Sequence, residues 1–164
     1  MSQNLMLYTV SGPDHPGITA ELMKVISQSS ATLVDIGQSI THGLLSLSFI
    51  LKSNDSLDQT TKELMFIAKK LKTELEYKAI QDERYSVGQG DKYILSCVAL
   101  DGIKPTFLSS IASVLADNNI NIQRIDNITD EKLTSLDIST LAKSTDVDWE
   151  KVKTELIVLS LIHI

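Results

Sequence analysis

The sequence predicts an α+β protein made of two ferredoxin-like units, each an antiparallel sheet with its helices on one face. Apolar runs and helical periodicities alternate in the order β-α-β-β-α-β over residues 4–82. The same order begins again after a polar segment. The 164 residues suffice for two small domains, and with aromatic residues at 5% the cores must be built from Leu, Ile and Val.

The elements of the first unit follow from the spacing of its apolar residues. From Ile18, apolar side chains recur at i, i+4, i+7 and i+8, which is one face of a helix. Residues 32–41 alternate in the manner of a strand with one mainly apolar face, and His42-Gly43 is typical of a hairpin turn. We expect strands at 4–11, 32–41, 44–52 and 75–82, and helices at 17–29 and 57–73.

The second half repeats this pattern. An offset of 88 residues sets Val34-Asp35-Ile36 opposite Ile122-Gln123-Arg124, which indicates an internal duplication. Asp146 is interpreted as the N-cap of the last helix, and Asp148 as a charge in its first turn. We expect strands at 92–100, 120–128 and 133–141, a helix around 107–115 and another at 146–159. The expected domains are residues 1–84 and 92–164, joined by a linker at 85–91.

The second unit has no clear closing strand. The apolar run Leu156–Ile164 either continues the last helix to about residue 162, or supplies a strand from Val158 after a shorter helix, or the chain is cut before that strand. In a ferredoxin-like sheet the fourth strand pairs with the first, so its loss leaves an apolar edge open. An open edge is a template for pairing, and we therefore expect sheet-to-sheet pairing within the chain or between chains.

The candidate site is the turn Gly12-Pro13-Asp14-His15-Pro16-Gly17, between the first strand and the first helix. Its glycines and prolines stiffen or bend the backbone, and N–H groups at the start of a helix bind carboxylates. A structural turn that binds nothing is the alternative. The equivalent segment Asp101-Gly102-Ile103-Lys104-Pro105 makes the same connection with one Gly and one Pro. A purely structural turn would not need the extra residues, which favours a ligand site in the first unit.

Composition excludes several classes of function. The net charge is −6 and no dense Lys/Arg cluster occurs, so neither nucleic acid nor a membrane surface is an expected partner. The N-terminus lacks a signal-peptide pattern, and no apolar run reaches the roughly 20 residues that span a bilayer. Cys97 is the single cysteine, which rules out an internal disulfide and fits a cytoplasmic location. No cluster has the spacing of metal ligands or of a catalytic acid–base pair, so no metal, cofactor or catalytic residue is expected.

The first unit resembles the ACT domain, a small-molecule-sensing regulatory module. That domain has Gly-x-Asp-x-Pro-Gly after its first strand, which matches residues 12–17 here. Residues 11–20, 34–40 and 42–47 are similar to the tandem ACT region of bacterial phosphoserine phosphatases. That family carries a catalytic domain with an Asp-x-Asp-x-Thr motif, whereas Asp146-Val147-Asp148 is followed here by Trp149-Glu150. The resemblance therefore implies the regulatory part of an enzyme of serine biosynthesis, without enzymatic activity of its own.

The resemblance also implies a ligand and an assembly. The ligand would be a free amino acid, serine or glycine, held between two ACT units of a homodimer. Carried over by position, the site residues would be Gly12, Asp14, His15, Pro16 and Gly17 in the loop, with Asp35, Ile36 and Gln38, or Asn121 and Ile122, on the facing strand. The alternatives are a free-standing tandem ACT transcriptional regulator of the glycine-cleavage-repressor type and, less favoured, a small enzyme on a ferredoxin-like fold.

Overall fold

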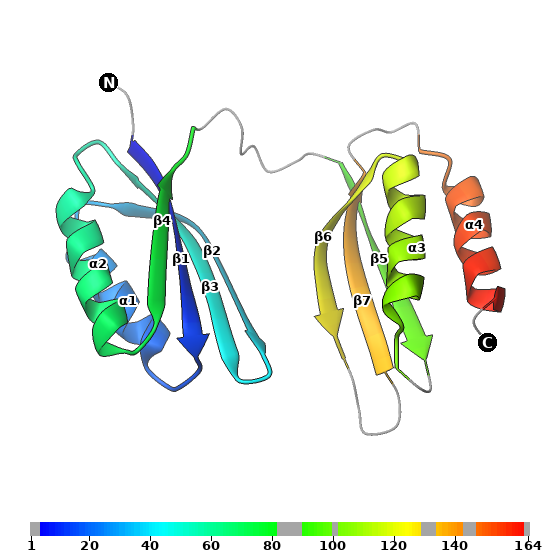
Figure 1. The fold of residues 1–164 in the computed structure, drawn as a ribbon. Helices are drawn as coiled ribbons and strands as arrows, with labels where there is room; N and C mark the ends of the chain where they lie inside the picture. Colours follow the sequence, from blue (N-terminus) through cyan, green and yellow to red (C-terminus); the bar gives the residue numbers. More distant parts are fainter. Residues whose placement is uncertain (1–3, 82–89, 100–101, 129–133, 143–146, 163–164) are drawn as a thin grey trace. The chain divides into compact units, whose positions relative to one another are not determined.

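The structure, a computed structural model, describes residues 4–81, 90–99, 102–128, 134–142 and 147–162 (Figure 1). The chain divides into two compact units, Met1–Ser86 (unit 1) and Val87–Ile164 (unit 2), each of which is described by itself. Most of the expected linker, the turn expected after residue 128 and the expected cap Asp146 lie outside the described residues.

Unit 1 is a four-stranded antiparallel sheet with both helices on one face (Figure 1). The strand order β2-β3-β1-β4 puts the first strand between the third and the fourth, which confirms the ferredoxin-like prediction. Its elements are β1 (Asn4–Pro13), α1 (Ile18–Ser27), β2 (Thr32–Thr41), β3 (Leu44–Ser53), α2 (Asp58–Lys70) and β4 (Glu74–Ala79).

The core of unit 1 lies between the central strands and the helices. Tyr8 of β1 stacks on Phe49 of β3 with ring centroids 5.2 Å apart, and both side chains are buried. Leu22 of α1 and Leu64 of α2 pack into the same cluster, as the helical spacing predicts. The β2–β3 turn has positive φ at His42 (49°) and Gly43 (75°), the backbone that a two-residue hairpin requires.

Unit 2 is a three-stranded antiparallel sheet of order β5-β7-β6, with two helices. Its last helix runs to Ile162, so a helix, rather than a strand from Val158, forms the apolar run up to that residue. Within the described residues no strand pairs with the outer edge of β5. The elements are β5 (Asp91–Ala99), α3 (Pro105–Asp117), β6 (Ile120–Asn127), β7 (Thr134–Ala142) and α4 (Trp149–Ile162).

The two sheets share an irregularity that fixes the register of the duplication. In unit 1 the β2–β3 pairing skips Val34, and in unit 2 the β6–β7 pairing skips Gln123. These bulged residues are 89 positions apart, since 123 − 34 = 89. The offset of 88 taken from the sequence is therefore one residue short in this strand, and Asp35 corresponds to Arg124 instead of Gln123.

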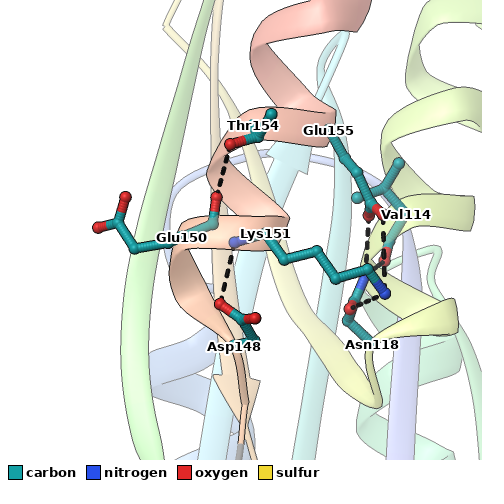
Figure 2. Close-up of polar contacts among 7 residues, drawn as sticks. All are labelled: Val114, Asn118, Asp148, Glu150, Lys151, Thr154 and Glu155. Atoms are coloured by element: carbon teal, nitrogen blue, oxygen red, sulfur yellow. Dashed lines mark hydrogen bonds and ion pairs between the residues drawn. The ribbon is translucent and has the colours of Figure 1, made fainter.

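Polar contacts join α4 to α3 (Figure 2). Asn118 Nδ2 donates to Val114 O at 2.8 Å and to Glu155 Oε2 at 3.1 Å, and Lys151 Nζ donates to Asn118 Oδ1 at 3.4 Å. The N–H of Lys151 donates to Asp148 Oδ1 at 3.0 Å. Asp148 thus caps the helix from the position before it, and its interpretation as a first-turn charge was wrong, because α4 begins one residue later.

Candidate functional site

In unit 1 the start of the β1–α1 loop contacts the β2–β3 turn and the corner between α2 and β4. Asp14 N donates to Gly43 O at 2.8 Å, which ties the loop to the β2–β3 turn. Gly12 has φ of 156°, and a Cβ there would lie 3.1 Å from the Cα of Thr73, at the α2–β4 corner. Gly12 therefore brings the loop closer to that corner than another residue would permit.

The end of the loop presents the N-terminus of α1. Gly17 is the N-cap, with φ of 102° and ψ of −16°, and no side chain bonds to the first-turn amides. Gly17 O already accepts the first helical bond, from Glu21 N at 3.0 Å. Pro16 and Gly17 are exposed, so the partial positive charge of the helix end faces solvent. This is the arrangement that a carboxylate recognises.

His15 spans the loop and the end of α2. Its Nδ1 and Nε2 lie 3.2 Å from Pro16 O and from Leu71 O, respectively. The bond to Leu71 O raises the pKa of the exposed imidazole above its usual value, and the bond to Pro16 O and the charge of Asp14 act in the same direction. The structure therefore engages both nitrogens of His15 within the chain, in a geometry that favours the imidazolium.

Strand β2 supplies the remaining candidates in unit 1. Thr19 Oγ1, in the first turn of α1, donates to Gln38 Oε1 at 2.7 Å, which links the helix end to β2. Ile36 shares the helix-side face with Gln38, because their partners Phe49 and Leu47 are core residues. Asp35 belongs to the opposite face, and its Oδ1 accepts from the N–H of Ile36 at 2.8 Å. The structure thus connects Gln38 to the loop but does not connect Asp35 to it.

Asn121 and Ile122 lie on β6 of unit 2. Asn121 is exposed, whereas Ile122 is partly buried against the core of unit 2. With the register corrected, the residue equivalent to Asp35 is Arg124, which carries the opposite charge and pairs with Asp126 at 2.7 Å. Strands β2 and β6 therefore carry opposite charges at this equivalent position, Asp35 in β2 and Arg124 in β6.

The corresponding loop of unit 2 has a simpler chemistry. Gly102 takes positive φ (83°), and Pro105 begins α3. The N-cap is Lys104, in an extended conformation and without a side-chain cap. This helix end is preceded by a lysine, where α1 has the neutral Gly17, and no residue equivalent to His15 stands beside it in the described part of the loop.

Four neighbours of the loop were not predicted from the sequence: Thr19, Gly43, Leu71 and Thr73. Gly43 and Thr19 could have been identified from the sequence, since a hairpin turn and a hydroxyl in a first helical turn are local patterns. Leu71 and Thr73 gave none, because the α2–β4 corner depends on Lys72, which adopts a positive φ of 57°.

Neither a metal centre nor a reactive cysteine is found among the described residues. Among them no three His, Cys, Asp or Glu side chains gather in a way that would hold a metal ion. Burial raises the pKa of the Cys97 thiol, which is the environment of a structural cysteine rather than of a nucleophile. No described helix combines the length and the apolar character needed to cross a bilayer.

Comparison with known sequences identifies relatives of unit 1. Residues 4–78 match the ACT domain family. A UPF0237 protein of Methanococcus maripaludis is 37% identical over 70 residues, which cover 43% of this chain and 77% of that protein.

Comparison with solved structures extends the likeness of fold over both units. A protein of unknown function from Galdieria sulphuraria superposes with a TM-score of 0.76 and 15% identity, covering 98% of this chain and 94% of that one. A putative glycine cleavage system transcriptional repressor superposes with a TM-score of 0.74 and 13% identity, covering 99% and 93%. At these identities the likeness concerns the fold alone.

Proposed function

Because the chain belongs to the ACT-domain family, we propose that it is a regulatory module that binds a small amino acid at the β1–α1 loop of unit 1. Both units have the fold of ACT regulatory domains. The observation that carries the proposal is the exposed N-terminus of α1, which has Gly17 in a left-handed conformation and no side-chain cap.

The loop offers a partner for each charged group of an amino acid. The first-turn amides of α1 take the ligand carboxylate, since they are donors at the positive end of a helix. The Asp14 carboxylate, exposed in the same loop, takes the ammonium group. The bonded pair Thr19–Gln38 lies beside the helix end and offers polar atoms to a small hydroxyl. L-Serine fits these three features, and glycine fits the first two.

A second unit completes the site in this proposal. The loop residues are exposed, so a single unit would leave one side of the ligand in water. ACT domains typically pair, and a homodimer brings a facing strand. The wall comes from Asp35, Ile36 and Gln38 of β2, or from Asn121 and Ile122 of β6, in a second copy of the chain.

The regulated process is the finer part of the proposal. The resemblance of residues 11–20 and 34–47 to phosphoserine phosphatases supports control of serine synthesis. The full-length likeness of fold to a putative glycine cleavage repressor supports the second candidate, a free-standing transcriptional regulator. The reading frame that continues from Ile164 separates them: an Asp-x-Asp-x-Thr strand favours the phosphatase, and a stop codon favours the regulator. A reducing cytoplasmic location, in which the single buried thiol stays free, suits both.

Isothermal titration calorimetry with L-serine and glycine tests the ligand. We expect saturable heat with serine, and binding about tenfold weaker in Asp14→Asn, which keeps the shape and removes the charge. Asp58→Asn, an exposed acid at the start of α2, is the matched control and should bind like the unchanged protein. Absence of heat with both amino acids on the folded dimer would contradict the function. Full binding by Asp14→Asn would contradict only the assigned site.

A further inference from the structure

The Pro16–Gly17 peptide lies at the entrance of α1, and its orientation decides which of its polar groups faces a ligand. On one side of this peptide the ring of Pro16 fixes φ. On the other side Gly17 has φ of 102°, a value that a glycine can leave at little cost. The peptide can therefore turn over by rotation about ψ of Pro16 and φ of Gly17, unless a contact holds it.

His15 supplies a contact that holds this peptide. Its Nδ1 lies 3.2 Å from Pro16 O. In a trans peptide the C=O and the N–H point in opposite directions, so holding Pro16 O beside the imidazole directs the N–H of Gly17 away from it. No described carbonyl accepts a hydrogen bond from this N–H. It is therefore a donor that can act together with the first-turn amides of α1.

The other side of the imidazole is held by the end of α2. Nε2 of His15 lies 3.2 Å from Leu71 O, and Leu71 is the C-cap of that helix. Carbonyls at the end of a helix have no donor within it and carry the negative end of its dipole. Figure 1 shows that β1 and α2 finish at the same end of unit 1. The ring is thus fixed between α2 and the loop.

Both contacts of the ring are hydrogen bonds only when it is protonated. A carbonyl oxygen accepts and cannot donate, and a neutral imidazole has a single N–H. After loss of the proton, a lone pair of one ring nitrogen would face either Pro16 O or Leu71 O. In the first case the peptide is released directly, and in the second the ring loses its anchor on α2.

The charges around the ring act in both directions. The two carbonyl bonds and the charge of Asp14 raise the pKa of His15 above 6.5, whereas Lys72, at the corner between α2 and β4, opposes them. Other ionisable side chains of the surrounding elements do not act on the ring, namely Glu21 of α1, His42 of the β2–β3 turn, Lys69 and Lys70 of α2, and Glu74 of β4.

We propose that His15 is a positioning residue of the amino-acid site, which makes ligand binding depend on one proton. The imidazolium bonds to Pro16 O and Leu71 O, and so directs the N–H of Gly17 toward the ligand carboxylate. Without the proton the peptide is released and this donor is no longer held in place. His15 acts through the backbone and does not touch the ligand. This inference rests on the proposed function.

The orientation of the peptide can be measured without any ligand. Three-bond couplings between the amide and α protons of Gly17 report its φ, and the ring-proton shifts of His15 report its protonation. We expect couplings that match φ of 102° below about pH 6 and that change as His15 titrates above it. In His15→Arg, which keeps a cation with N–H donors at every pH, they should stay constant. Couplings that stay constant with pH in the unchanged chain would overturn the proposal.

Calorimetric titration with L-serine at about pH 6 and about pH 8 measures the consequence for binding. We expect about tenfold weaker binding at the higher pH, and by linkage serine should raise the pKa of His15. His15→Arg retains only the pH dependence that comes from the ionisation of serine itself. His42→Asn changes another exposed histidine, at a positive φ that asparagine tolerates, and should keep the full pH dependence.

The results separate the role of His15 from the proposed function. Equal affinity for serine at both pH values, or a pH dependence that His15→Arg retains in full, would overturn the role of His15 and leave the proposed function intact. Absence of binding at both pH values would contradict the proposed function and, with it, the proton dependence of binding.

Discussion

Units 1 and 2 share one order of elements up to their last helices. They differ in the connection between the first strand and the first helix, and at one edge of the sheet. Unit 2 makes its strand-to-helix connection with Gly102 and Pro105, without the Asp-His-Pro-Gly sequence that unit 1 inserts. Since both connections lead into a regular helix, the fold does not demand the additional residues. Under the proposed function, these additional residues of unit 1 form the ligand site.

The second difference lies at the sheet edge. In unit 1 β4 covers β1, and Tyr8 reaches α2 through a bond between its hydroxyl and Thr61 Oγ1 at 2.7 Å. Leu95 of unit 2 pairs with the buried Ile138 as Tyr8 pairs with the buried Phe49. This equivalent residue has no hydroxyl, and the space beside it is open. Unit 1 thus has more buried contacts along this edge, and we expect it to be the more stable unit.

The largest expected effect comes from core truncation in each unit. Leu22→Ala in α1 and Ile111→Ala in α3 remove equivalent buried side chains, 89 residues apart, and each should cost about 2–5 kcal/mol. Trp149 fluorescence reports the unfolding of unit 2, and calorimetry reports both units. If the units unfold separately, Leu22→Ala leaves the Trp149 transition unchanged, whereas Ile111→Ala moves it to lower denaturant. An equal shift in both variants would show that the comparison of two separate units is wrong.

The next effect concerns the backbone of the loop. Gly17→Ala places a Cβ at φ of 102°, where no atom lies within 4 Å, so the cost is conformational and about 1–3 kcal/mol. Gly37→Ala is the control, since Gly37 is also uncrowded but lies in β2 without a positive φ. Chemical denaturation of both variants should show a loss in Gly17→Ala alone. Equal stability of the two variants would mean that Gly17 is not held in this conformation.

A smaller effect is expected at Tyr8. Thr61 Oγ1 donates to Leu57 O at 2.8 Å, so the Tyr8 hydroxyl is the donor in the Tyr8–Thr61 bond. Tyr8→Phe should cost about 0.5–1.5 kcal/mol, the usual net contribution of one such bond. Burial raises the pKa of Tyr8, so the loss should be independent of pH near neutrality. Calorimetric unfolding of unit 1 measures this loss of stability. An unchanged transition in Tyr8→Phe would show that the bond does not stabilise unit 1.

The smallest effect is the pH dependence of His15. Its pKa is raised above the unfolded value of 6.5, chiefly by the bond to Leu71 O. The stabilisation is therefore fully present below pH 6.5 and is lost as pH rises through the folded pKa. His15→Gln should destabilise unit 1 more at about pH 5 than at about pH 8. A difference that is constant with pH would exclude the imidazolium between the loop and α2.

The sequence predicted most of the fold because its signals are local. The spacing from Ile18, the alternation in residues 32–41 and the His42-Gly43 turn each identified an element that the structure contains. The register of the duplication was predicted one residue short, because bulges at Val34 and Gln123 in two strands leave no mark in the hydrophobic pattern. The structure of residues 156–164 was left open, since this segment is apolar apart from Ser160 and His163 and lacks a clear period.

Only part of the candidate site could be predicted from the sequence. Gly12 and Gly17 were selected from residue type, and positive φ at both positions is what that residue type permits. The contact of His15 with Leu71, and that of Gly12 with Thr73, join segments more than 50 residues apart. Such contacts depend on the corner at Lys72, and no spacing rule reveals it.

The most direct test of the difference between the units is a titration of the full chain with L-serine, followed by amide chemical shifts. We expect saturable shifts at Gly17, Ile18 and Thr19, and none at Gly102, Lys104 or Thr106. Shifts confined to the unit 2 loop, or no shifts at either loop, would contradict it.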